Sequence, residues 1–343
     1  MGKIILTGAS GLTGTHIAEY FSARGLKLTC LVRWSSNIEF LKTLNVEICY
    51  ADLNNPEELR KALHGAECII HTAGKVGDWG CFDEFYKTNV IGTLNLLEAA
   101  KFNDVKHFIT TGSISCYGEE STPVVKNEEM EYNSHYNYFL DKIFPSGMNY
   151  YRDTKAEINN RAIEYCNKND INLTIIEPAW IYGEREFNSG FYDFLKSMKS
   201  GLSFTPGSRK NKFHTIYVRD LAKIYYLAYQ KKLVGINKIL AVATKAEFQY
   251  KLLDLFCWNA GFRIPKRIPK FFIYPPAFLT ELFYTAFRIK TAPAISRARI
   301  NIFYDNIEYS GKKARELLGY EPDYTLEESI EKTVRWYKDN NYL

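Results

Sequence analysis

The segment Thr7-Gly8-Ala9-Ser10-Gly11-Leu12-Thr13-Gly14 decides the fold class. Its glycines have the spacing GxxGxxG, and it lies between an apolar strand pattern, Lys3–Leu6, and a helix pattern, Gly14–Ala23. Glycines at such a junction permit a tight turn, a close approach of phosphate to the backbone, and close packing of helix on strand. The amides at the helix N-terminus would then face a pyrophosphate. The segment therefore predicts a dinucleotide site formed by Gly8, Ser10, Gly11, Leu12 and Gly14.

Strand and helix patterns alternate through the rest of the first half of the chain. The expected strands are Leu28–Val32, Val46–Ala51, Cys68–His71, His107–Thr111 and Leu173–Glu177. The expected helices are Ile38–Leu44, Pro56–Leu63, Phe82–Ala100 and Tyr150–Asn167. The strands are nearly continuous apolar runs, which is typical of a parallel sheet covered by helices on both faces. We therefore predict an α/β fold with a Rossmann-type, doubly wound parallel sheet.

The pattern changes along the chain and suggests two parts. Residues 1–180 are predicted to form the dinucleotide-binding domain. Residues 181–343, where the alternation weakens, are predicted to form mainly a smaller substrate-binding lobe that interleaves with the end of the sheet. Residues 119–150 have no clear period, so we expect them to form a long surface excursion near the site.

Composition excludes several functional classes. The net charge of +5 is small for 343 residues and the basic residues are spread out, so we expect no nucleic-acid partner. The seven cysteines form no CxxC pair and the six histidines have no metal-ligand spacing, which predicts reduced thiols and no metal. We expect neither a signal peptide nor a membrane-spanning helix, and we predict a cytoplasmic protein.

The end of the second strand indicates which dinucleotide binds. NAD-binding proteins usually have Asp or Glu there, to bind the ribose 2′-hydroxyl. This chain instead has Arg33-Trp34-Ser35-Ser36, without a carboxylate. The guanidinium of Arg33 can pair with a 2′-phosphate, and the hydroxyl of Ser35 can donate to it. These residues predict NADP as the cofactor, with NAD as the alternative.

A second pair of residues points to proton transfer. Tyr151 and Lys155 are four residues apart in an expected helix, so both lie on one face, one turn apart. A phenol has a pKa of about 10, and a neighbouring ammonium lowers it. Two segments give the pair a context. Thr110-Thr111-Gly112-Ser113 ends a strand in hydroxyls, and Glu177-Pro178-Ala179-Trp180-Ile181 follows the next strand pattern.

In this order the motifs resemble those of the extended short-chain dehydrogenase/reductase family, the NAD-dependent epimerase/dehydratase superfamily. The resemblance runs nearly end to end, through Val218-Arg219-Asp220-Leu221-Ala222 to Leu318-Gly319-Tyr320-Glu321-Pro322. It is closest to the branch of 3β-hydroxysteroid dehydrogenases and dihydroflavonol reductases. The set of motifs is highly specific for the superfamily and much less specific for the branch.

The resemblance implies a role for each matching position. Ser113 would polarise a substrate carbonyl beside Tyr151, with Ser115 as the second candidate, and Lys155 would tune the tyrosine and bind the nicotinamide ribose. Asn89 would support the central strands and a proton-relay water, or else be a buried structural residue. The remaining cofactor contacts would come from Asp52, Leu53, Thr72, Ala73, Gly74, Pro178 and Ile181.

The implied reaction is hydride transfer between NADP(H) and a carbonyl or secondary alcohol of a small-molecule substrate. Related dehydratases usually carry Thr-Asp-Glu where this chain has Ser113-Ile114-Ser115, so the acid pair that expels water is absent. Sugar-nucleotide epimerases usually carry Arg-Asp where this chain has Phe213-His214. An epimerase with tightly bound NAD(P) is therefore the second hypothesis, and a non-catalytic NADP-binding regulator is the third.

The segment 271–287 is strongly aromatic and has basic residues on both sides. We expect either a lid over an apolar substrate (steroid-, lipid- or polyketide-like) or a peripheral contact with a membrane, with a plain core helix as the third interpretation. Pro275, Pro276 and Glu281 argue against a membrane span. The family resemblance also implies a homodimer formed through helices Phe82–Ala100 and Tyr150–Asn167.

Overall fold

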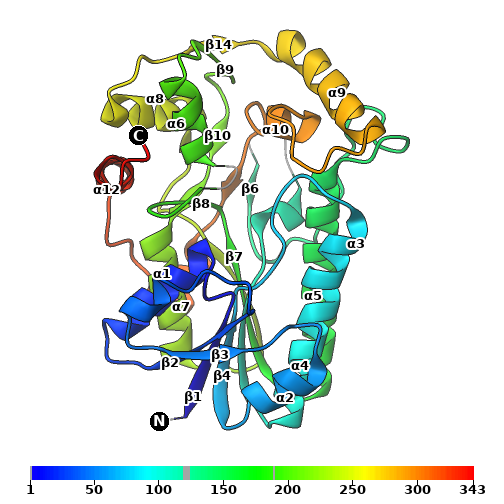
Figure 1. The fold of residues 1–343 in the computed structure, drawn as a ribbon, viewed down its shortest axis with the longest axis vertical. Helices are drawn as coiled ribbons and strands as arrows, with labels where there is room; N and C mark the ends of the chain where they lie inside the picture. The colour runs from blue at the N-terminus through cyan, green and yellow to red at the C-terminus, as the bar shows by residue number, and fades with distance from the viewer. Residues whose placement is uncertain (1, 119–123, 188–189) are drawn as a thin grey trace.

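A seven-stranded parallel sheet forms the centre of the protein (Figure 1). A computed structural model describes residues 2–118, 124–187 and 190–343. The strand order is β12-β7-β5-β4-β1-β2-β3, and it reverses direction between β1 and β4, as in a doubly wound sheet. The strands are β1 (Lys3–Thr7), β2 (Leu28–Val32), β3 (Glu47–Tyr50), β4 (Ala66–His71), β5 (His107–Thr111), β7 (Asn172–Pro178) and β12 (Ile236–Ala241). The predicted fold class is confirmed.

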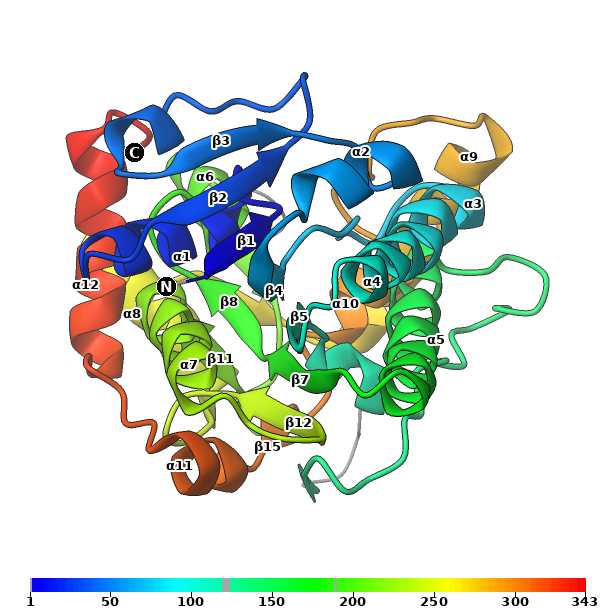
Figure 2. The same cartoon turned by 90° about the horizontal axis from the view of Figure 1, so that it is seen from below.

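Helices cover both faces of this sheet (Figure 2). Side chains alternate between the two faces along β1. Ile4 and Leu6 belong to the apolar core on one face of the sheet, and Ile5 belongs to the core on the other. Both faces of the strand are therefore apolar and buried. The helices on the first face are α1 (Leu12–Ser22), α7 (Val218–Lys231) and α11 (Lys312–Leu318). Those on the second are α2 (Pro56–Ala62), α4 (Gly92–Phe102) and α5 (Gly147–Lys168).

Two expected helices differ from the prediction. The prediction of a helix over Ile38–Leu44 was wrong, because this segment forms only one 3₁₀ turn, Leu41–Thr43. Leu41 is the one residue of that turn that is buried, so packing stabilises no more than a turn. The predicted helix Phe82–Ala100 is instead α3 (Phe82–Phe85), a π-helical turn over Tyr86–Ile91, and α4. Such π turns are frequent at functional sites.

A second core lies beyond the carboxyl edge of the sheet. It is formed by α6 (Phe191–Lys199), α8 (Gln249–Ala260) and α12 (Leu326–Asp339), with the rings of Phe191 and Phe256 stacked 4.4 Å apart. Four two-stranded pairs surround it: β8 (Trp180–Tyr182) with β11 (Thr215–Tyr217), β10 (Lys212–Phe213) with β13 (Glu247–Phe248), β9 (Phe204–Pro206) with β14 (Lys266–Ile268), and β6 (Val125–Lys126) with β15 (Glu308–Tyr309).

The remaining helices, α9 (Lys270–Ala286) and α10 (Arg297–Asn301), pack on each other and on the segment before α5. No helix in the described part of the chain is long and apolar enough to cross a bilayer. The expected excursion over residues 119–150 lies partly outside the described residues. Its described part contains β6, turns, and the start of α5.

Candidate active site

The residues predicted to form the site lie at one edge of the sheet. Because the strands are parallel, their carboxyl ends meet there, where ligands bind in doubly wound folds. The glycine loop follows β1, Arg33 and Ser35 follow β2, Asp52 and Leu53 follow β3, Thr72, Ala73 and Gly74 follow β4, Ser113 follows β5, and Pro178 ends β7. Ile181 lies three residues beyond Pro178, in β8, paired with Ile216.

The glycine loop leaves no room for side chains. Gly8 has a φ of +69°, and a Cβ there would lie 2.5 Å from the backbone nitrogen of Ala73. A Cβ on Gly14 would lie 2.2 Å from the carbonyl oxygen of Gly8. The first glycine therefore allows the turn and its contact with the loop after β4, and the last allows α1 to pack on that turn.

The start of α1 is suited to an anion. Gly11 is its N-cap and offers no side-chain acceptor to the amides of the first turn. These amides and the positive end of the helix dipole favour a phosphate group. The backbone cradle and the exposed helix terminus together fit the pyrophosphate of a dinucleotide, with Ser10 and Leu12 beside it.

The end of β2 presents a cation beside a carboxylate. Arg33 is exposed and opens a turn in which the Ser36 amide donates to the Arg33 carbonyl oxygen at 2.9 Å. The pKa of Asp52 is lowered, first because the amide of Asn54 donates to it at 2.8 Å, and further by the charge of Arg33. Next to Arg33, the exposed indole of Trp34 stacks on the ring of Tyr50, a pair that the sequence patterns did not indicate.

Three side chains form the predicted catalytic group. The Ser113 side chain lies close enough to Tyr151 to act on the pKa of its phenol, and the hydroxyls of Ser113 and Ser115 are 2.8 Å apart. Lys155, one helical turn after Tyr151, donates from Nζ to the carbonyl oxygen of Thr111 at 2.5 Å. Helix α5 and the end of β5 thus bring two hydroxyls and one amine to the same end of the sheet.

Burial dominates the protonation of this group. It raises the pKa of Tyr151 to about 12, although the nearby Ser113 side chain acts in the opposite direction. It lowers the pKa of Lys155 to about 8, while Cys116 and Glu177 act to raise it. The expected lowering of the tyrosine pKa by Lys155 is therefore not found, and desolvation of the phenol is the main cause of the raised pKa. The Tyr151 phenol is therefore protonated at neutral pH.

Asn89 has a structural role that the π-helical turn makes possible. Its Oδ1 accepts from the backbone amide of Lys75 at 2.7 Å. Its Nδ2 donates to the Lys75 carbonyl oxygen at 3.1 Å and to the hydroxyl of Thr154 at 3.3 Å. These bonds tie the loop after β4 to α5. Asn89 is thus a buried residue that holds the loop after β4 against α5, and its expected role in a proton relay stays a prediction.

A buried carboxylate behind the catalytic group was missed by the sequence analysis. Glu177 in β7 accepts from the hydroxyls of Tyr117 and Tyr132, both at 2.7 Å, and from Nδ2 of Asn159 at 3.3 Å. Burial raises the pKa of Glu177 to about 7. A Glu before Pro178 was visible in the sequence, but Tyr132 lies in the segment without a clear period and gave no signal.

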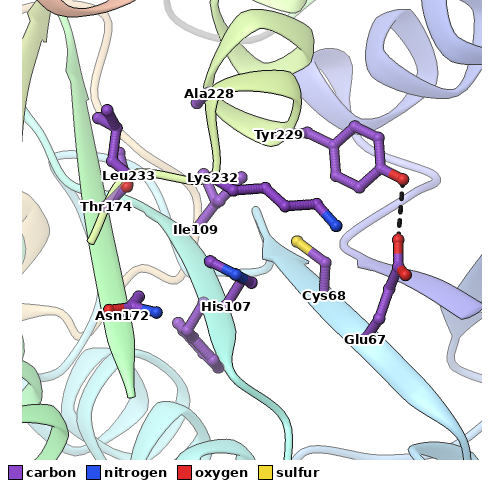
Figure 3. Close-up of a pocket in the computed structure, with 11 residues that line it drawn as sticks. Glu67, Cys68, His107, Ile109, Asn172, Thr174, Ala228, Tyr229, Lys232 and Leu233 are labelled. Atoms are coloured by element: carbon purple, nitrogen blue, oxygen red, sulfur yellow. Dashed lines mark hydrogen bonds between the residues drawn. The ribbon is translucent and has the colours of Figure 1, made fainter. Parts of the chain in front are cut away.

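A separate small pocket lies at the opposite edge of the sheet (Figure 3). The amino ends of β4, β5 and β7 line it, with Cys68, His107 and Asn172, and the hydroxyl of Tyr229 donates to Glu67 beside it at 2.9 Å. Its free volume of about 10 Å³ is roughly that of one water molecule. Because it lies at the amino ends of the strands, this pocket is distinct from the candidate site at their carboxyl ends.

The sheet topology, the glycine cradle and the Ser–Tyr–Lys group define a dinucleotide-binding protein of the Rossmann class. The family model "NAD dependent epimerase/dehydratase family" matches residues 4–243. The chain belongs to this family, which confirms the resemblance drawn from the ordered motifs. The cofactor of the family is a nicotinamide dinucleotide, and the backbone cradle at Gly8 and Gly14 fits one.

Similar proteins cover nearly the whole chain. A 2-alkyl-3-oxoalkanoate reductase of Stenotrophomonas maltophilia (strain K279a) is 24% identical over 339 residues, covering 96% of this chain and 97% of the relative. A sterol-4-alpha-carboxylate 3-dehydrogenase, decarboxylating, of Mus musculus is 24% identical, covering 97% and 90%. The crystal structure of gox2253 superposes with a TM-score of 0.79 at 22% identity, covering 99% of both chains, and shows the same fold.

Proposed function

We propose that this protein is an NADP(H)-dependent oxidoreductase that interconverts a carbonyl and a secondary alcohol on an apolar substrate. The observation that carries the proposal is that Tyr151 and Lys155, one turn apart on α5, lie beside Ser113 at the carboxyl end of β5, where Lys155 bonds the Thr111 carbonyl oxygen, at the edge of the sheet where the glycine loop lies. The family match and the dehydrogenase and reductase relatives support a nicotinamide-dependent enzyme acting on a CH–OH group.

The two hydroxyls would act on one substrate oxygen. The bound nicotinamide would supply or accept the hydride. Ser113 has a neighbour in Ser115 at 2.8 Å that can accept from or donate to it, so its hydroxyl can turn towards a carbonyl oxygen as negative charge develops. Tyr151 would give its proton to that oxygen in reduction and take it back in oxidation.

Lys155 would stabilise the negative charge that develops on Tyr151 during proton transfer. Its pKa of about 8 means that the amine is mostly protonated at neutral pH and loses its charge a little above it. A protonated Lys155 stabilises a developing phenolate on Tyr151 by simple charge attraction. Its bond to the Thr111 carbonyl oxygen fixes the amine at the end of β5, beside Gly74.

We assign NADP rather than NAD because of the cation at the end of β2. Arg33 is exposed there, and a 2′-phosphate can be bound in a bidentate manner by a guanidinium. In a fluorescence titration, Arg33→Ala should weaken NADPH binding by about 10- to 100-fold, because a charged hydrogen bond contributes about 1.5–3 kcal/mol. NADH binding should change little. The matched control is Arg60→Ala, an exposed arginine on α2.

Equal weakening of NADPH and NADH binding by Arg33→Ala would contradict the NADP assignment while leaving the oxidoreductase proposal intact. Tighter binding of NADH than of NADPH by the wild-type protein would raise the epimerase hypothesis instead.

An apolar substrate is supported by the names of the relatives and by composition. The two relatives are named for an alkyl-substituted oxoalkanoate and for a sterol carboxylate. This chain has 25 Tyr and 22 Phe, and aromatic side chains commonly line apolar pockets.

The test of the function is the stoichiometry of cofactor use. An oxidoreductase should consume one NADPH for each ketone reduced, when simple cyclic and long-chain ketones are supplied. Net conversion of a sugar nucleotide without change in cofactor absorbance would identify an epimerase. Cofactor binding with neither behaviour, in a broad carbonyl panel and its alcohols, would identify a regulator.

A further inference from the structure

Helix α9 presents an apolar face to solvent. Phe272, Pro276, Leu279, Phe283 and Phe287 follow one another at intervals of three or four residues, which puts them on a single stripe of the helix and its C-cap. The Phe and Leu side chains of this stripe are between 53% and 69% exposed. The helix lies at the end of the molecule opposite the N-terminus (Figure 1), and the exposed fractions show that the described residues leave the stripe open to solvent.

The segment before α5 extends this apolar face. Phe139, Leu140 and Ile143 are exposed, and the ring of Phe139 contacts that of Phe278 on α9, with the ring centroids 5.2 Å apart. Contiguous exposed apolar side chains of this kind mark a surface that meets a partner or a membrane. We refer to the α9 stripe and residues 139–143 together as the apolar end.

The charged residues of α9 and its flanking segments are almost all basic. Residues 262–290 contain Glu281 as their single acidic residue, and Glu281 is buried. The same stretch contains six basic residues, of which Arg267 is paired with Asp254. The other five, which flank the apolar stripe on both sides, are Arg263, Lys266, Lys270, Arg288 and Lys290.

Buried contacts fix the orientation of this surface. The carboxylate of Glu281 on the inner side of α9 is paired with the buried Arg297, which donates to it from Nε and from Nη2, both at 2.8 Å. The same guanidinium donates to the carbonyl oxygens of Phe139 and Phe144. Turning the outer face of α9 inward would break this pair and leave a charge unpaired in the interior. The apolar face therefore stays outside.

We propose that the apolar end binds the surface of an anionic lipid bilayer. An amphipathic helix with an aromatic face and basic flanks is suited to lie in the interface, with its rings at the acyl boundary and its cations at the headgroups. A second copy of the chain docking face to face would bring like charges together, since this face carries no exposed carboxylate between residues 262 and 290. Pro275 and Pro276 lack amide protons, which favours a helix lying on the bilayer over one that crosses it.

This inference goes beyond the proposed oxidoreductase function and does not depend on it. It is tested by sedimentation of the purified full-length protein with sucrose-loaded vesicles. The vesicles contain either phosphatidylcholine alone or phosphatidylcholine mixed with phosphatidylserine. The wild-type protein should sediment with the mixed vesicles, sediment much less with phosphatidylcholine alone, and lose binding as salt is raised.

Two pairs of substitutions separate the apolar and charged contributions. Arg288→Gln with Lys290→Gln should weaken binding to the mixed vesicles by about 25-fold, because each basic group near an anionic surface contributes about fivefold. Leu279→Ser with Phe283→Ser should weaken it by at least about tenfold, because both side chains would no longer be buried in lipid. The matched controls are Lys61→Gln with Lys168→Gln, and Val234→Ser, all at exposed positions away from α9.

Unchanged thermal midpoints and unchanged cofactor binding show that the variants are folded. Absence of wild-type binding to the mixed vesicles would overturn the proposal. Equal losses in the control variants would do the same. A shift from dimer to monomer in Leu279→Ser with Phe283→Ser, without vesicle binding by the wild type, would identify the face as a contact between copies of the chain instead.

Discussion

Helices α5 and α9 show opposite relations between composition and burial. Helix α5 is polar, yet Arg152, Thr154, Lys155 and Asn159 on it are buried. Helix α9 is rich in phenylalanine, yet within it Ala277 and Glu281 are the buried residues. Buried polar groups and exposed apolar groups both lower stability, so each pattern points to a function that the helix serves.

The contrast follows from what each helix contacts. Two of the buried polar side chains of α5 have partners on the central strands: the Thr111 carbonyl oxygen for Lys155 and Glu177 for Asn159. These partners hold the catalytic group in place at the carboxyl end of β5. The outer face of α9 has no such partner within the described chain, which fits a surface whose partner is a lipid bilayer.

The largest effect is expected from a substitution on α5 that removes a hydroxyl but keeps the ring and its packing. Tyr151→Phe removes the hydroxyl that we propose gives or takes the substrate proton, so kcat should fall by about 10²- to 10⁴-fold. NADPH affinity and the thermal midpoint should stay close to those of the wild type. The measurement is steady-state turnover with the best ketone from the panel, and Tyr150→Phe, one residue earlier on α5, is the control.

Wild-type turnover in Tyr151→Phe would remove Tyr151 from the mechanism. A comparable loss in Tyr150→Phe would show that the helix tolerates no change, rather than that Tyr151 carries the proton.

The next prediction concerns the buried carboxylate under α5. Burial raises the pKa of Glu177 from 4.5 to about 7, so the folded state holds a proton that the unfolded state has lost over this range. The free energy of unfolding should therefore fall as pH rises from 4.5 to 7, by about 3 kcal/mol from this group. The free energy of unfolding of Glu177→Gln should lack this fall. Its stability relative to the wild type should therefore increase by about 3 kcal/mol between pH 4.5 and pH 7.

The measurement is urea unfolding of both proteins across this pH range, with Glu98→Gln on the exposed side of α4 as the control. If the difference in unfolding free energy between wild type and Glu177→Gln stays constant with pH, the pKa of Glu177 is the same in the folded and unfolded states, and this carboxyl is less strongly desolvated than we infer.

Sequence patterns predicted the regular parts of the molecule, and the residues that they assigned to the site lie at one edge of the sheet. The glycine spacing, the apolar strands and the four-residue separation of Tyr151 and Lys155 are local, so they could be read directly. The Glu177 network could not, because Tyr132 is 45 residues away in a segment with no period. The exposure of α9 could not either, because an aromatic segment predicts burial as readily as a docking face. The homodimer and the cytoplasmic location stay predictions.

The smallest effect is expected at His135, in the segment before α5 that also contacts α9. His135 lies between the carboxylates of Asp153 on α5 and Asp141, at 2.8 and 3.0 Å, and Asp141 belongs to the segment that supports α9. The pKa of His135 is raised above 6.5, first by the hydrogen bond to Asp153. The stabilisation is thus fully present below pH 6.5 and is lost as pH rises through the folded-state pKa.

Because the His135 side chain is more than half exposed, solvent screening limits this contribution to about 0.2–1 kcal/mol. His135→Gln should lower the thermal midpoint slightly at pH 5.5 and leave it unchanged at pH 8.5, whereas His64→Gln, an exposed histidine before β4, should show no such difference. If vesicle binding also weakens in His135→Gln at pH 5.5 alone, the catalytic helix and the apolar end are coupled through this one imidazole. If only the midpoint changes, the two helices keep their separate roles and His135 serves stability.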